Sequence, residues 1–244
     1  MSRRYVFLAI ALAVSAVCVR LGFWQLARLS QRRARNAMES GRLGQPVIDF
    51  ARGSPDSVAP YRRVHATGRL DFARELAVTF RSHDGSPGVY LVTPLVRDGT
   101  DTLVLVNRGW VYSPDGVTVD LTKWGETSDP RNPGTFSLDG YALAFEPDRA
   151  ASDSAARSTR AVTRLDRARL ERRFGAPVAG YYLVMLRGEH DGALGPVRLG
   201  EPTFDDGPHL SYAVQWFLFA VTFGAGGVIV VLRDRRRRAP GGSP

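Results

Sequence analysis

The chain has one cysteine, Cys18, and one lysine, Lys123, among its 244 residues. A single cysteine cannot build an internal disulfide framework or a cysteine-based zinc site. The sequence also lacks three common enzyme motifs: a phosphate-binding glycine-rich loop followed by lysine, HExxH and GxSxG. Its four histidines are scattered, and its three methionines are isolated, so the ligand cluster of a copper carrier is missing. We therefore expect a protein that is not an enzyme.

A nucleic-acid-binding surface is also missing, although the formal net charge is +9. Twelve arginines lie within or beside two apolar segments at the ends of the chain, where the acid set against them is Asp234. The rest of the chain is close to neutral, and a protein that follows a phosphate backbone needs a basic surface. We expect no nucleic-acid partner.

The two apolar segments are the strongest pattern in the sequence. Residues 5–19 continue through residues 21–27 after Arg20, and residues 212–232 carry no formal charge. At a rise of about 1.5 Å per residue, a helix over either segment can cross a hydrocarbon core of about 30 Å. The sequence therefore predicts a membrane protein in which two transmembrane helices flank one domain, with lipid as a partner.

Two alternatives for the first segment stay open. A cleaved signal peptide is disfavoured because the apolar pattern runs on beyond Leu21. Lipidation of Cys18 is disfavoured because Val17, the residue before it, is larger than usual at such a site.

Arginines that flank the two segments predict the topology. Five of them follow the second segment, Arg233 and residues 235–238, and Arg3 and Arg4 precede the first. Positive charge is retained on the cytoplasmic side, whereas the basic stretch 28–35 opposes this orientation. We expect a multi-pass protein of a bacterial-type inner membrane, with both termini cytoplasmic and the middle domain extracytoplasmic.

The predicted domains are residues 1–35, 36–208 and 209–244. The middle domain shows strand patterns at residues 61–70, 75–81, 89–97, 103–112, 136–145 and 181–187. Asp84-Gly85 and Asp98-Gly99 suit turns between adjacent antiparallel strands. A short amphipathic helix is predicted at residues 165–174, ended by Gly175, and residues 148–160 read as a surface loop. We expect a mainly antiparallel β (α+β) domain, a curled sheet or barrel.

Two groups of residues are candidates for binding at the outer membrane surface. His209, Tyr212 and Trp216 recur at helical spacing, and neutral imidazole is a common metal ligand. Arg20, Trp24 and Arg28 are four residues apart and form a basic, aromatic stripe on the other helix. That stripe is either an interfacial anchor with snorkelling arginines or a cationic rim for an acidic amphiphile. The two aromatic residues beside His209 also have a non-functional explanation, since tyrosine and tryptophan favour the membrane interface.

The chain resembles the surfeit-locus-one family of cytochrome oxidase assembly factors over most of its length. The resemblance is carried by LGFWQLAR at residues 21–28, YRRV at 61–64, GRLD at 68–71, VNRGWV at 106–111 and HLSYAVQW at 209–216. The order of these motifs, the two terminal spans and the chain length also fit the family.

The resemblance implies a role in maturing haem–copper (cytochrome c) oxidase, as a chaperone of respiratory-chain biogenesis. It implies haem a as a transient cofactor, with oxidase subunit I and the haem a synthesis machinery as partners. It makes His209 the candidate haem contact and metal ligand. It marks further motif residues whose role is either functional or structural: Gln25, Asn107, Arg108, Gly109, Trp110 and Gln215. A membrane scaffold that binds no haem and an extracytoplasmic enzyme are the alternative functions.

Overall fold

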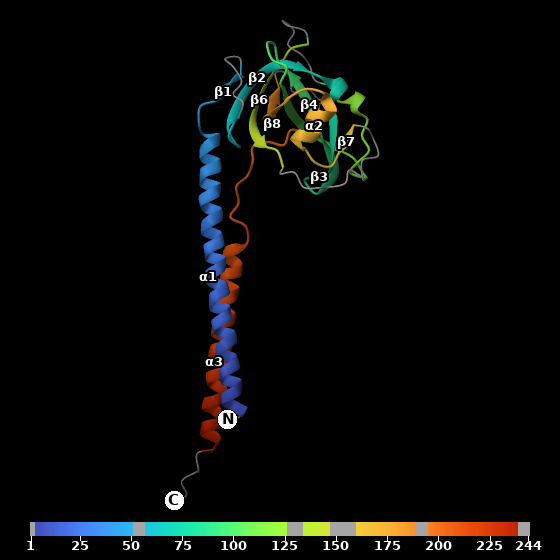
Figure 1. Cartoon of the computed structure of the whole chain (residues 1–244). Helices are drawn as coiled ribbons and strands as arrows, with labels where there is room; N and C mark the ends of the chain where they lie inside the picture. The colour runs from blue at the N-terminus through green and yellow to red at the C-terminus, as the bar shows by residue number, and fades with distance from the viewer. Residues whose placement is uncertain (1–2, 51–56, 126–133, 147–159, 189–194, 239–244) are drawn as a thin grey trace, which may run out of the picture. The chain divides into compact units, whose positions relative to one another are not determined.

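The computed structural model describes residues 3–50, 57–125, 134–146, 160–188 and 195–238. Helices α1 (Arg3–Leu43) and α3 (His209–Arg238) stand at the two ends of the chain, and a β domain lies between them in sequence (Figure 1). Both are long and apolar enough to span a membrane. The expected fold class is confirmed.

Two compact units make up the molecule: residues 1–38 with 204–244, and residues 39–203. The domain boundaries predicted after residues 35 and 208 stay a prediction. The loop predicted at residues 148–160 lies almost wholly outside the described residues.

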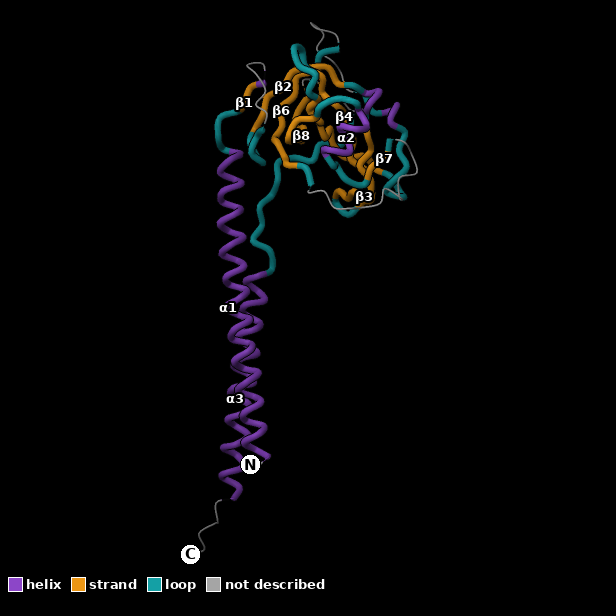
Figure 2. The backbone as a smooth tube through the Cα atoms, in the orientation of Figure 1, coloured by secondary structure: helices purple, strands orange, loops and turns teal. Residues whose placement is uncertain are grey.

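The β domain is built from short elements that follow one another closely (Figure 2). They are β1 (Ile48–Asp49), β2 (Arg63–Leu70), η2 (Phe72–Arg74), β3 (Leu76–His83), β4 (Ser86–Val96), β5 (Leu103–Tyr112), η3 (Leu121–Lys123), β6 (Phe136–Ala144), β7 (Ala161–Val162), α2 (Arg167–Phe174) and β8 (Val178–Gly188).

Five of the strands close into a barrel. The order in the sheet is β1-β2-β6-β8-β5-β4-β3-β7, and an additional antiparallel pairing joins β2 to β4 at Arg69–Val96 and Leu70–Leu95. The closed ring is therefore β2, β6, β8, β5 and β4, with β3 and β7 continuing beyond β4. Closure leaves no unpaired strand edge within the ring, which protects it from pairing with other chains.

Buried side chains from all five strands of the ring form one apolar cluster. It includes Val64 and Ala66 of β2, Leu138 of β6, Leu183 of β8, Val106 of β5 and Leu95 of β4. Helix α2 covers a second cluster, in which Leu170 packs with Val78 of β3 and Leu105 of β5 (Figure 2).

The predicted turns and helix end are confirmed. Asp84 and Gly85 both have positive φ, 48° and 77°, as the two-residue turn of the β3–β4 hairpin requires. Helix α2 starts after Asp166, whose side chain accepts from the Arg169 N–H, and ends at Gly175.

One strand boundary was predicted wrongly, and three parallel pairings were not predicted at all. The first strand begins at Arg63 rather than at residue 61, because Tyr61 has φ 66° and cannot continue a strand. The pairs β1–β2, β3–β7 and β5–β8 are parallel, which the turn signals did not predict. Parallel pairing joins segments distant in sequence, so no local turn motif announces it.

Candidate functional site

Helices α1 and α3 lie side by side and run antiparallel (Figure 1). A Cβ placed on Gly22 would lie 2.6 Å from the Phe217 ring, and the Ser15 hydroxyl donates to the Ala220 carbonyl at 2.8 Å. Small residues allow membrane helices to approach this closely. We call the line of contact between the two helices the seam; its buried members are Ala11, Cys18, Gly22 and Leu29 on α1 and Ala213, Ala220, Gly227 and Val231 on α3. Successive members are four or seven residues apart on each helix, as in the heptad repeat of a packed helix pair.

His209 is the first residue of α3, and its side chain lies beside the seam and contacts α1. The ring Nδ1 lies 2.9 Å from Oε1 of Gln25 on α1. A carboxamide oxygen can only accept a hydrogen bond, so Nδ1 donates, and in the neutral form of the ring Nε2 then carries the lone pair. This is the tautomer that a metal-binding histidine uses, with its second nitrogen held by a hydrogen-bond partner. The motif residue Gln25 thus orients the predicted ligand.

A charged clasp lies just before His209 and ties the start of α3 to α1. Asp205 accepts from the Arg32 guanidinium at 3.2 Å through its side chain, and from Arg32 and Asn36 at 2.9 and 2.8 Å through its carbonyl. Arg33 pairs with Asp206 at 2.7 Å. The sequence analysis missed the clasp, although two arginines and two aspartates flank the facing ends of the apolar segments. The clasp holds the start of α3 against α1 and so fixes the position of His209.

On α1, Trp24 and Arg28 each come one residue before a seam position, Gln25 and Leu29. One residue turns a helix by about 100°, so both side chains lie to one side of the seam. Both are exposed, and the Arg28 guanidinium stands 5.5 Å from the centre of the Trp24 ring. This geometry is a cation–π contact.

On α3, Tyr212 and Trp216 likewise come one residue before Ala213 and Phe217. Tyr212 is exposed and Trp216 is half-buried. Because both helices are right-handed and they run antiparallel, the same offset from the seam places residues of α1 and α3 on the same side. His209, four residues before Ala213, lies at the edge of that side.

The structure therefore brings together five of the predicted cofactor residues. We call them the flank: Trp24, Arg28, His209, Tyr212 and Trp216. Two other candidates lie elsewhere. Arg20 is two residues from both Cys18 and Gly22, and Gln215 is two residues from both Ala213 and Phe217, so each faces away from the seam, and both are exposed.

The Asn107–Trp110 motif lies in the β domain, inside β5, where Arg108 is an extra residue relative to β4. Leu91 pairs with Gly109 and Val92 with Asn107, which makes a β-bulge. Gly109 has φ 140°, and a Cβ there would lie 2.3 Å from the Val197 carbonyl oxygen. A side chain at this position would meet both a strained backbone and the Val197 carbonyl, so the motif glycine has a structural role.

The bulge turns Arg108 into the interior of the domain. Its side chain is fully buried and pairs with the buried carboxylate of Glu75. Thr93 bonds to both, accepting from Arg108 Nε at 2.9 Å and donating to Glu75 at 2.7 Å. Arg108 also donates to the Trp124 carbonyl at 2.7 Å. Its described contacts are thus internal to the β domain.

Trp110 is 8% exposed and packs over Gly88 of β4, where a Cβ would lie 2.3 Å from the indole nitrogen. The centre of its ring lies 5.5 Å from the centre of the His83 ring. A large aromatic side chain thus fills the space above a glycine, which is a structural role.

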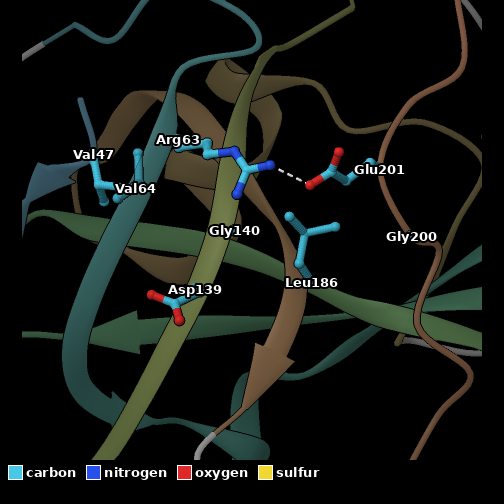
Figure 3. Close-up of a pocket in the computed structure, with 8 residues that line it drawn as sticks. All are labelled: Val47, Arg63, Val64, Asp139, Gly140, Leu186, Gly200 and Glu201. Atoms are coloured by element: carbon cyan, nitrogen blue, oxygen red, sulfur yellow. Dashed lines mark hydrogen bonds and ion pairs between the residues drawn. The ribbon is translucent and has the colours of Figure 1, made fainter. Parts of the chain in front are cut away.

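A pocket of about 450 Å³ opens in the β domain between β2, β6, β8 and the segment of Gly200 and Glu201 (Figure 3). Arg63 reaches across it to form an ion pair with Glu201. The carboxylate of Asp139, on its wall, accepts from Nδ1 of His65 at 2.8 Å. The sequence analysis did not identify this pocket; each charged side chain that lines it has an internal partner.

One arrangement of side chains beside that pocket bears on the alternative function as an enzyme. Nε2 of His65 lies 3.3 Å from the Ser137 hydroxyl while Nδ1 faces Asp139, the order of a Ser-His-Asp triad. However, the side chains of His65 and Asp139 are 39% and 63% exposed. A triad aspartate is buried, and an exposed pair is held only weakly. The arrangement therefore gives an enzyme little support.

A smaller pocket of about 120 Å³ includes Arg81, Asn107, Glu146 and Tyr182. Burial raises the pKa of Tyr182 to about 12. Its phenol therefore stays protonated near neutral pH and cannot serve there as a base.

Comparison with known proteins agrees with this architecture. The model of the SURF1 family matches residues 12–221. SURF1-like proteins of Mycobacterium tuberculosis and Mycobacterium bovis are 31% identical to the chain over 251 residues, which cover 98% of it and 89% of each relative. A yeast protein named cytochrome oxidase assembly protein SHY1 is 31% identical over 109 residues, 43% of this chain and 28% of its own length.

Two spanning helices packed along a small-residue seam, with a β barrel between them in sequence, define a two-span membrane protein with one folded domain. Within that class, the match over most of its length shows that the chain belongs to the SURF1 family.

Proposed function

We propose that the chain assists the assembly of a haem–copper cytochrome c oxidase by holding haem a at the flank before its delivery to subunit I. The observation that carries the proposal is the His209–Gln25 pair, which presents Nε2 with its lone pair beside the seam. Membership of the family, and the oxidase-assembly name of the yeast relative, support the role in assembly.

The residues present fit a haem group. Nε2 of His209 would supply a nitrogen ligand for the iron, and Gln25 would fix the ring tautomer. Arg28 offers a guanidinium for a propionate, a charge-assisted bond that suits carboxylates. Trp24, Tyr212 and Trp216 supply aromatic surface for an apolar macrocycle. Arg20 faces away from the seam, so we assign the propionate contact to Arg28. When bound, haem would supply the redox centre that the oxidase uses, and this chain would hold it until delivery.

The haem a synthesis machinery, as donor, and oxidase subunit I, as acceptor, are the partners that such a carrier needs. A scaffold that gathers the same partners without binding haem is the competing function. The two differ in one measurement. Protein purified in detergent from membranes that make haem a should show a Soret band, and protein from cells unable to make haem a should not show the haem a spectrum.

Loss of the gene provides the test of the assembly role itself. Membranes that lack the chain should contain less oxidase activity and less haem a per subunit I, and expression of the intact chain should restore both. Oxidase that is fully loaded and active without the chain would contradict an assembly role. Reduced oxidase with no Soret band on the purified chain would leave the scaffold.

We expect the β domain outside the cytoplasm and both termini inside. Replacing Cys18 with serine removes the natural thiol. Ser82→Cys then adds one at an exposed position of β3, and Ser243→Cys adds one in the C-terminal tail. A membrane-impermeant maleimide should label Ser82→Cys in intact spheroplasts and Ser243→Cys only after lysis, because the arginines at the end of α3 keep that end in the cytoplasm. The reverse pattern of labelling would overturn this topology.

A further inference from the structure

Arg20 lies within the apolar span and not at its edge. Gly22 faces Phe217 and Ser15 faces Ala220, so Arg20 stands level with that part of α3. The apolar segment of α3 begins at Tyr212, five to eight residues earlier. At about 1.5 Å per residue, the Arg20 backbone is therefore roughly 8–12 Å inside the level of Tyr212.

The Arg20 side chain is on the side of α1 that α3 leaves uncovered. It is exposed, and within the described part of the chain it has no hydrogen-bond or ion-pair partner. The adjacent turns of this face, Ala13 and Ala16, are also exposed. A charged residue in a membrane span is costly, and such residues normally pair with another group.

Snorkelling to the interface is a poor solution for Arg20. In a helix the Cα–Cβ bond tilts toward the N-terminus, and long side chains follow it. The nearer end of the span is the C-terminal one, beyond Trp24, so the side chain leaves the backbone in the direction of the membrane interior. A polar group of a neighbouring helix at the same depth can bind the guanidinium without the side chain having to turn back toward the membrane surface.

We propose that this face of α1 docks a transmembrane helix of a partner protein, which carries an aspartate or glutamate at the depth of Arg20. The carboxylate complements the guanidinium charge and accepts two parallel hydrogen bonds from it. Ala13 and Ala16 do not obstruct the close approach of a second helix. The face is distinct from the flank, so this docking is independent of haem binding.

Site-specific photo-crosslinking in native membranes tests the proposal. Ala16 of the full chain is replaced by a benzophenone amino acid, and the crosslinked peptide is sequenced. We expect a membrane-spanning peptide of another protein, with an acidic residue in it. A second probe at Val221, exposed on α3, serves as the positional control and should not give this peptide.

Changes at Arg20 then test the charge. Arg20→Leu should lower the yield of the Ala16 crosslink by about threefold to fifteenfold, the worth of one interhelical polar bond, while Arg20→Lys should retain most of it. Arg20→Leu makes the span more apolar, so insertion is preserved. Adducts with lipid or with a second copy alone, no adduct, or an equal yield in Arg20→Leu would overturn the proposal.

Discussion

Replacing His209 with alanine should abolish or strongly shift the haem absorption of the purified protein, while its level in the membrane stays near normal. The imidazole is the one predicted axial ligand, so its loss removes the iron contact. The cost to the fold is small, since the side chain makes one described hydrogen bond, to Gln25, worth about 1 kcal/mol. The measurement is the haem spectrum in detergent beside an immunoblot of the membranes.

Two sets of controls separate ligation from general damage. His65→Ala and His83→Ala change histidines of the β domain and should keep the spectrum. Gln25→Ala keeps the ligand but frees its ring, and the loss of such a supporting contact typically weakens binding by about tenfold to a hundredfold. An unchanged spectrum in His209→Ala, at equal protein level, would rule out axial ligation and leave the scaffold function ahead.

The elements that could be predicted from sequence are those encoded by local pattern. Residues 212–232 have no charge, so a spanning helix was predictable from composition and length. Asp84-Gly85 announced a hairpin because few other residue pairs adopt two consecutive positive φ values. The predicted strand 103–112 matches β5 because its run of β-branched and aromatic residues lies between clear turns.

The features that could not be predicted depend on residues far apart in the chain. The barrel closes through the short pairing of β2 with β4, two strands that no single turn connects. The clasp joins Arg32 to Asp205 across 173 positions of sequence. Helical spacing placed His209, Tyr212 and Trp216 on one face, but only the antiparallel seam shows that Trp24 and Arg28 share that side and that Arg20 does not.

Arg108 shows the same limit most clearly. A polar residue within a strand pattern reads as solvent-facing or functional, and the Asn107–Trp110 motif left both roles open. The bulge at Arg108 and the buried acid at Glu75, 33 residues earlier, together place the charge inside the domain. Gly109 within the strand pattern is typical of a bulge, but the sequence around Arg108 gives no sign of Glu75.

Arg108→Ala should therefore lower the amount of folded protein severely. Removing one partner of a buried ion pair leaves the other charge unpaired, which costs about 3–5 kcal/mol, a large share of the stability of a single domain. Glu75→Ala should do the same, since it leaves the guanidinium buried with Thr93 and Trp124 as its neighbours. The measurement is the protein level in membranes together with the thermal midpoint of the protein in detergent.

A double variant distinguishes this internal role from contact with a partner. Arg108→Met with Glu75→Leu removes both charges and keeps much of the buried volume, and such replacements are often neutral. It should recover most of the level that either single change loses, and the oxidase-assembly phenotype should recover with it. If Arg108 served an external partner, Arg108→Ala would leave the level intact and abolish function, and the double variant would rescue nothing. The full burial of both side chains favours the first outcome, because a partner cannot reach a guanidinium that Glu75 already encloses.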